Sequence, residues 1–197
     1  DGVIAWVNGV EVYRSAFMPA GDPDGDTGTS PNEHESSNGS SPVYTPLQDI
    51  TAAVLPGVLH NGTNVLAIGV WNKGQPSSDL VLVPQLLMED DTAPELPLAF
   101  GSSMRYLANN SNPGLGTSWT IEGINDDAWT IGSYGVGYET RTGAPLAGNL
   151  LQTTVPSDTQ SVYTRASFNI TNVASVNNLY LGVDYDDGVV AWINGVE

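Results

Sequence analysis

The sequence predicts an all-β protein, an antiparallel β-sandwich or jelly roll, and three observations support this fold class. Short runs rich in Val, Ile and Trp alternate with turn residues, and the chain contains 22 Gly and 13 Pro. The run Val3–Val7 is followed by Asn8-Gly9, a dipeptide typical of a two-residue hairpin turn. Residues 65–71 are continuously apolar, as in a strand that is buried on both faces.

Each element follows from its local pattern. The first hairpin is expected to pair Val3–Val7 with Val10–Arg14, and the same hairpin starts again at Val189–Ile193. Further strands are expected at residues 64–71, 80–87, 117–121, 162–170 and 178–185. Residues 48–55 predict the only short helix, which Pro56-Gly57 would end. Short strands between Gly- and Pro-rich turns are typical of a sandwich or jelly roll.

Residues 1–11 and 187–197 are two copies of one segment. DGVIAWVNGVE and DGVVAWINGVE differ only at Ile4/Val190 and Val7/Ile193, and their starts are 186 residues apart. A repeat of this kind indicates a tandem array that is cut within a domain. Residues 1–89 would be the C-terminal part of one β-sandwich repeat, and residues 99–197 the N-terminal part of the next. Residues 90–98, with two prolines and the adjacent acids Asp90 and Asp91, are expected to form a stiff linker without a regular strand.

Charge and composition exclude several classes of function. The chain has 5 Lys+Arg against 22 Asp+Glu, a formal charge of −17, which argues against binding to nucleic acid or to an anionic membrane surface. No apolar run approaches the roughly 20 residues of a membrane-spanning helix. Cysteine is absent, so disulfides and thiolate metal sites are excluded and the redox compartment is left open.

Residues 186–195, DDGVVAWING, resemble the D-D-G-x-V-x-Y-x-N-G hairpin of galactose-binding-like β-sandwich modules of secreted bacterial proteins, with Trp192 in place of the usual Tyr. Similar motifs of that family match EVYRSAFMPAG (11–21), LHNGTNVLAIGVWN (59–72) with SSDL (77–80), DDAWTIGSYGVGY (126–138) and YTRASF (163–168). The family order requires residues 99–186 to precede residues 1–89. The resemblance implies a jelly roll in permuted, tandem-repeat form. It leaves carbohydrate binding and purely structural roles open, often with bound calcium.

An acidic loop is the main candidate for a metal site. Asp22, Asp24 and Asp26 alternate, and Glu33 follows eleven residues after Asp22, a spacing that can bring hard oxygen ligands onto one Ca²⁺. We expect a structural calcium here, because three close carboxylates repel one another unless they are neutralised. The alternative is a solvated acidic loop. Asp186 and Asp187 form a weaker cation candidate, for which turn chemistry is the favoured interpretation.

The remaining candidate residues are scattered. Trp71 is a weak candidate for stacking on a sugar ring, with burial in the core as the alternative. Sequons that would accept glycans occur at Asn38, Asn61, Asn109 and Asn169. Two His, no Cys and no nucleophile-elbow or zinc-protease motif give no basis for catalysis, so the chain is not expected to be an enzyme.

The favoured hypothesis is a structural subunit of an extracellular or cell-surface fibre, joined head to tail by sandwich completion between neighbouring repeats. Residues 1–11 and 187–197 would compete for one place in a sandwich. The contact between repeats is expected at strand residues of both copies, which are Val3, Ala5, Val7, Val189, Ala191 and Ile193. The expected partners are neighbouring copies or repeats of the chain, with glycans as a further candidate. The alternative is a calcium-dependent carbohydrate-binding module of a secreted enzyme or adhesin.

Overall fold

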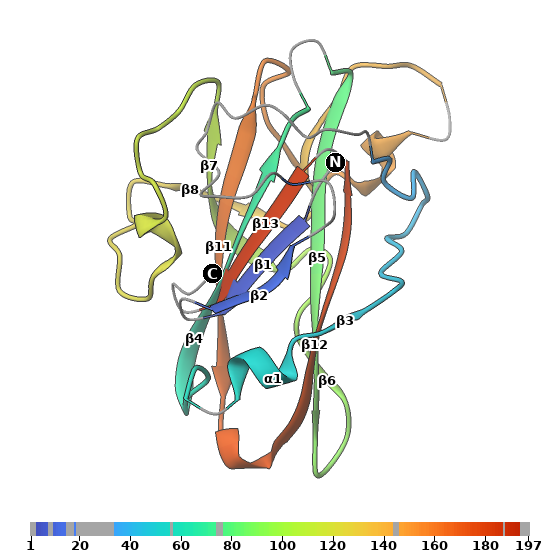
Figure 1. Cartoon of the computed structure of the whole chain (residues 1–197). Helices are drawn as coiled ribbons and strands as arrows, with labels where there is room; N and C mark the ends of the chain where they lie inside the picture. The colour runs from blue at the N-terminus through green and yellow to red at the C-terminus, as the bar shows by residue number, and fades with distance from the viewer. Residues whose placement is uncertain are drawn as a thin grey trace.

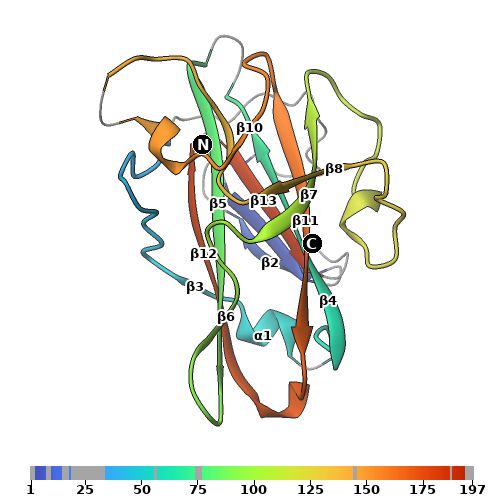
Figure 2. The same ribbon diagram turned by 180° about the vertical axis from the view of Figure 1, so that it is seen from behind.

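Two β-sheets pack face to face in the computed structural model, which describes residues 3–7, 10–14, 18, 34–55, 57–73, 77–143, 146–186 and 188–193 (Figures 1 and 2). Sheet A has the order β2-β1-β13-β4-β11-β7-β8, and sheet B has the order β10-β9-β5-β12-β3 with β6 paired to β5. Most neighbouring strands are antiparallel, which confirms an all-β sandwich.

The strands of sheet A are β1 (Val3–Val7), β2 (Val10–Arg14), β4 (Gly62–Trp71), β7 (Ser103–Asn109), β8 (Thr130–Ser133), β11 (Ser161–Ile170) and β13 (Gly188–Ile193). Those of sheet B are β3 (Gln48–Asp49), β5 (Asp79–Asp90), β6 (Glu95–Leu98), β9 (Val136–Glu139), β10 (Thr153–Thr154) and β12 (Val176–Asp186). The helical turns are α1 (Thr51–Val54), η1 (Ser118–Thr120), η2 (Ala147–Leu150) and η3 (Val173–Ser175).

The main core lies between the two sheets and follows the two-residue period of the strands. Even-numbered residues of β4 and β11 point into it from sheet A, and β5 and β12 supply the opposing residues from sheet B. Its fully buried members include Leu66, Ile68, Val162, Leu82 and Leu181. Because each sheet also has a covered outer face, the residues that alternate with these core-facing ones need partners of their own.

The 59–64 motif forms the turn that starts β4. The side chain of Asn64 is buried, and its Nδ2 donates to the carbonyls of His60 and Gly62 at 2.9 and 3.1 Å. Its Oδ1 accepts from the backbone N–H of His60 at 3.2 Å. Gly62 has φ +96°, a left-handed conformation that favours glycine. The motif therefore sets the point at which β4 enters the sheet.

Several predicted elements are confirmed, although most strands are longer than expected. Strands at residues 3–7 and 10–14 match the prediction, and those predicted at 64–71, 80–87, 162–170 and 178–185 extend by one to several residues. The helix predicted at 48–55 is reduced to Thr51–Val54, because Gln48–Asp49 pair with β12 instead. The predictions omitted β7, β8, β9 and β10.

Two local predictions are wrong. Residues 117–121 contain the 3-10 turn η1 instead of a strand, because this segment lies over the outer face of sheet A and binds a buried arginine there. In the linker, β5 continues to Asp90 and β6 forms at Glu95–Leu98. Pro97 is tolerated because β6 pairs on one side only, with β5, and an edge strand does not need every N–H. The assignment of residues 1–89 and 99–197 to different repeats stays a prediction.

Candidate functional site

The two copies of the repeated segment lie side by side in sheet A. β13 pairs antiparallel with β4, from Gly188↔Trp71 to Trp192↔Ala67. β1 then pairs in parallel with the outer edge of β13, and every residue of β1 faces its own equivalent, from Val3↔Val189 to Val7↔Ile193. Figure 1 shows β1 and β13 as neighbours, with β2 beside β1. The predicted repeat-contact residues are thus paired with one another within one chain.

The outer face of sheet A carries a second, aromatic core. Trp71, Trp119 and Tyr163 are buried there together with Met18 and Ala67. The ring of Trp119 stacks on Tyr163 with centroids 4.3 Å apart and planes 5° apart. Gly69 makes room for Trp71, because a Cβ at residue 69 would lie 2.2 Å from the Trp71 ring. Trp71 was a weak candidate for stacking on a sugar ring, with burial in a core as the alternative. The structure shows the alternative, because the Trp71 side chain lies in this core and is only 2% exposed.

A buried arginine holds the segment that covers this aromatic core. Arg165 on β11 is 6% exposed and donates from Nε to Asp126 Oδ2 at 2.7 Å. Its Nη1 donates to the carbonyls of Trp119 and Ile121 at 2.5 and 3.0 Å. Arg105, which faces Arg165 across the ladder, reaches the other carboxylate oxygen of Asp126 at 3.3 Å. One carboxylate therefore joins two strands to the covering segment.

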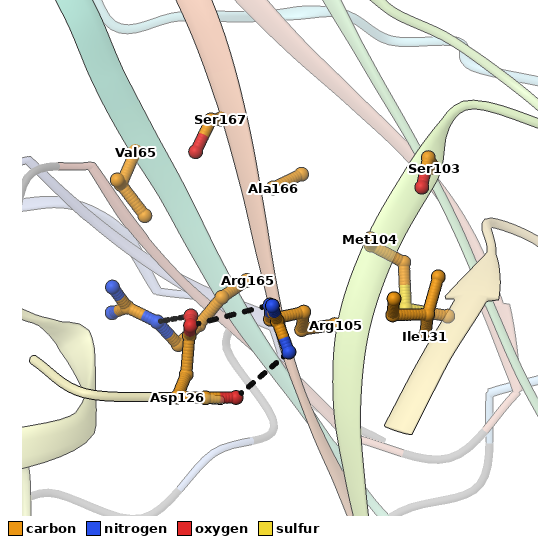
Figure 3. Close-up of a pocket in the computed structure, with 9 residues that line it drawn as sticks. All are labelled: Val65, Ser103, Met104, Arg105, Asp126, Ile131, Arg165, Ala166 and Ser167. Atoms are coloured by element: carbon orange, nitrogen blue, oxygen red, sulfur yellow. Dashed lines mark hydrogen bonds and ion pairs between the residues drawn. The ribbon is translucent and has the colours of Figure 1, made fainter. Parts of the chain in front are cut away.

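A pocket of about 330 Å³ opens beside this ion-pair group (Figure 3). The β7–β11 ladder ends at Arg105↔Arg165, whereas β11 continues along β4 to Ile170, so the two strands separate beyond the arginines. The pocket lies at this separation and is lined by Val65, Ser103, Met104, Arg105, Asp126, Ile131, Arg165, Ala166 and Ser167. Ile131 is 68% exposed at its rim. The lining offers hydroxyl groups, several apolar side chains and charges that are already paired.

The outer face of sheet B is covered by residues 34–47. Asp184 on β12 is buried and accepts from Ser37 N and Val43 N, each at 2.8 Å, and from Ser37 Oγ at 2.5 Å. Tyr44 packs over Gly182, where a Cβ would lie 2.7 Å from Tyr44 Cβ. Asp184 and Asp186 are therefore strand residues that bind a covering segment, and Asp186 lies in β12 rather than in a turn.

Three carboxylates meet at the end of this face. Glu35, Asp79 and Asp186 place one oxygen each within 4.8 Å of one another; Glu35 is exposed and both aspartates are buried. Asp186 also accepts from Ser36 N at 3.4 Å. Asp79 accepts from Ser78 Oγ at 2.7 Å and from Arg141. Burial raises the pKa of Asp79, and the charges of Glu139 and Glu35 add to that direction while the hydrogen bond from Ser78 and the charge of Arg141 oppose it.

The donor set of this cluster suits a hard cation. Carboxylate oxygens are the ligands that Ca²⁺ prefers, and close like charges are stabilised by a cation between them. Sequence reasoning named Asp186 but missed Glu35 and Asp79, because the three residues are far apart in the chain. The SSDL motif at residues 77–80 was the available signal for Asp79.

The predicted calcium loop, Asp22, Asp24, Asp26 and Glu33, lies outside the described residues, as does Asp187. The sequons differ in accessibility. Asn61 and Asn169 are exposed and Asn38 is half-buried. Asn109 is 7% exposed, and its Nδ2 contacts Ser161 Oγ at 3.3 Å. A glycan at Asn109 is incompatible with this packing.

Comparisons with models of protein families, with curated proteins and with solved structures find no match. Among the residues that the structure describes, no helix has both the length and the apolar character required to cross a membrane.

Replacing Arg165 with Met should destabilise the protein by about 3 kcal/mol or more, because it leaves Asp126 and two backbone carbonyls without their buried donor. Urea unfolding followed by tryptophan fluorescence measures this change. The matched control is Arg105→Met, at a side chain that is 32% exposed, with an expected loss below about 1 kcal/mol. Equal losses in the two variants would contradict the anchoring role of Arg165.

Proposed function

We propose that the chain is a non-enzymatic structural subunit of an extracellular, repeat-built fibre or surface assembly. Its fold would be a galactose-binding-like jelly roll whose chain is cut at a permuted point of a tandem repeat. Neighbouring repeats would be joined head to tail by sandwich completion. The pairing of β1 with β13 is the observation that carries this proposal.

The chain contains one more copy of the repeated strand than a single sandwich requires. β4 has two edges: β11 occupies one, and β13 occupies the other. Since β1 has almost the same sequence as β13, either strand suits the same place. In an array, the surplus strand of one repeat would become the strand that completes the next. The resemblance of residues 186–195 to a hairpin of secreted modules agrees with such an extracellular role.

The arrangement of both halves in one sandwich supports the same proposal. Residues 62–90 supply β4 and β5, and residues 161–186 supply β11 and β12. Each sheet therefore has one long strand from each side of the linker. A chain cut at this point can complete its own sandwich, and two neighbouring repeats can complete one in the same way.

A calcium-dependent carbohydrate-binding module is the second candidate function. The pocket beside Arg105 and Arg165 favours it, because Ser103 and Ser167 offer hydroxyl groups next to the exposed apolar side chain of Ile131. Glycan array binding that Ser167→Ala and Ile131→Asp abolish would favour this function over the structural one.

Sedimentation velocity over a concentration series tests the structural function. We expect species at multiples of the 20.7 kDa chain mass that increase with concentration, and fibres in negative-stain micrographs. A compact monomer at every concentration, from a gene that encodes no further repeats, would contradict the proposal.

Calcium is proposed as a structural cofactor that is bound by Glu35, Asp79 and Asp186. Chelation with EDTA should then lower Tm, because a ligand bound only to the native state stabilises it. Glu35→Gln should reduce this Tm shift, whereas Asp127→Asn, at an exposed carboxylate outside the cluster, should retain it. An unchanged melting curve with EDTA would refute the calcium proposal.

The raised pKa of Asp79 determines the direction in which Tm changes with pH. The raised pKa of Asp79 means that the folded protein binds its proton more tightly than the unfolded chain. Without a cation, this residue therefore contributes stability below its folded pKa that is lost as the pH rises through that value. Added calcium should reduce this loss, because it compensates the carboxylate charge.

A further inference from the structure

We infer that the gap between β7 and β11 is a strand-addition site, in which an extended peptide of another protein pairs with the edge of β11. The peptide would have uncharged side chains inside the gap and a basic residue at each end. This inference goes beyond both proposed functions, because it gives the pocket an occupant that is recognised through its backbone instead of through sugar hydroxyls.

The edge of β11 that faces β7 is only half used in the part of the chain that the structure describes. β4 pairs with all of β11, from Ser161 to Ile170, whereas the ladder with β7 ends at Arg165. Residues 166–170 therefore have β4 on one side and no described strand on the other. An open strand edge of this kind is a template for pairing with a further chain.

The hydrogen-bond pattern shows which backbone groups of β11 face the gap. In an antiparallel pair, opposite residues alternate between those that exchange both backbone hydrogen bonds and those that exchange neither. Asn72 N donates to Gln160 O at 2.8 Å in continuation of the β4–β11 register, so the even-numbered residues of β11 bond to β4. The odd-numbered residues Ser167 and Asn169 therefore direct their N–H and C=O groups toward the gap.

The opposite wall of the gap has the same property. Tyr134 N donates to Ser102 O at 3.0 Å in continuation of the β7–β8 register, so the even-numbered residues of β7 bond to β8. Ser103 therefore directs its N–H and C=O groups toward β11, although the ladder ends before it would pair with Ser167. Ser103, Ser167 and Asn169 are all exposed, so the gap is open to solvent.

The gap has a floor that suits one side chain of a guest strand. The pocket of about 330 Å³ is lined by Ser103 and Ser167 and also by Met104 and Ala166, which belong to the main core at 3% and 2% exposure. Figure 3 shows Ala166 and Ser167 on one side of the separation, with Met104 and Ser103 on the other. Successive side chains of a strand alternate between faces, so one small apolar guest side chain would point to this floor and its neighbours to solvent.

The charges around the gap determine the chemistry of the guest. Arg105 and Arg165, at the closed end of the gap, are both paired with Asp126. Asp127 contacts Arg105, and the Asp127 side chain is 82% exposed. Together with the formal charge of −17 on the whole chain, these contacts disfavour an acidic guest and favour one with Lys or Arg beside Asp127.

Peptide binding combined with residue-level hydrogen exchange tests the inference on the full chain. The probe is a fluorescein-labelled peptide of alternating Thr and Val with a Lys at each end. We expect saturable binding with a Kd below about 1 mM and, at saturation, about tenfold or more slower exchange of the Ser167 and Asn169 amides. The Ala166 and Phe168 amides bond to β4, so they should exchange slowly before the peptide is added and serve as controls within the same strand.

Matched probes and variants separate backbone pairing from other modes of binding. The same peptide with an N-methyl group on every Thr and Val lacks backbone donors and should not bind. A peptide with Glu in place of each Lys should bind about tenfold more weakly or less. Ser167→Pro removes an N–H that faces the gap and should abolish binding, whereas Ser167→Ala retains that N–H and should bind as the unchanged chain does. Thermal melts establish that both variants are folded, and the N-methylated peptide decides if Ser167→Pro is not.

The outcomes that would overturn the inference are distinct from those that test the proposed functions. Equal binding of the N-methylated peptide, no binding of the parent peptide at about 1 mM, or unchanged exchange of the Ser167 and Asn169 amides at saturation would each overturn it. Glycan binding that Ser167→Ala abolishes, without peptide binding, would overturn it and leave the carbohydrate-binding function standing. Assembly in sedimentation velocity is a separate readout, because β1 and β13 lie on the other side of β4.

Discussion

The antiparallel ladder between β4 and β11 is the constraint on which the rest of the structure depends. All ten residues of β4 pair with all ten residues of β11, from Gly62↔Ile170 to Trp71↔Ser161. The two strands come from opposite sides of the linker, so this ladder joins the two segments of the chain. It also sets the positions of both neighbours, since β13 pairs with the free edge of β4 and β7 with the free edge of β11.

Each sheet is covered on both faces, and one buried charged residue holds each outer cover. On sheet A, Arg165 binds the backbone of the 117–127 segment, which carries Trp119 over Tyr163. On sheet B, Asp184 accepts from the backbone of the 37–43 segment. Charge-assisted hydrogen bonds to backbone groups suit these places, because a covering segment that is not paired in a sheet leaves N–H and C=O groups in need of partners. The continuous burial of residues 65–71 follows from this double covering.

The features that could be predicted from the sequence are those that depend on strand periodicity and on turn chemistry. The apolar run of β4 and the Asn-Gly hairpin were recognisable because neighbouring residues determine them. Residues 117–121 were predicted wrongly, because a long-range contact with Arg165 overrides their local strand preference. The cluster of Glu35, Asp79 and Asp186 was missed for a related reason: only tertiary structure brings these carboxylates together. Asp126 and Arg165 lay within quoted motifs, but no local pattern indicated that they bind each other.

Residue-level amide hydrogen exchange tests most directly whether the two segments form one sandwich. A single cooperative unit predicts that the amides of β4, β5, β11 and β12 exchange at rates that report the same global unfolding free energy, with β1 and β2 exchanging faster than β13. Exchange of residues 62–90 and 161–186 with two separate free energies, or strong protection of β1 with weak protection of β13, would contradict the account.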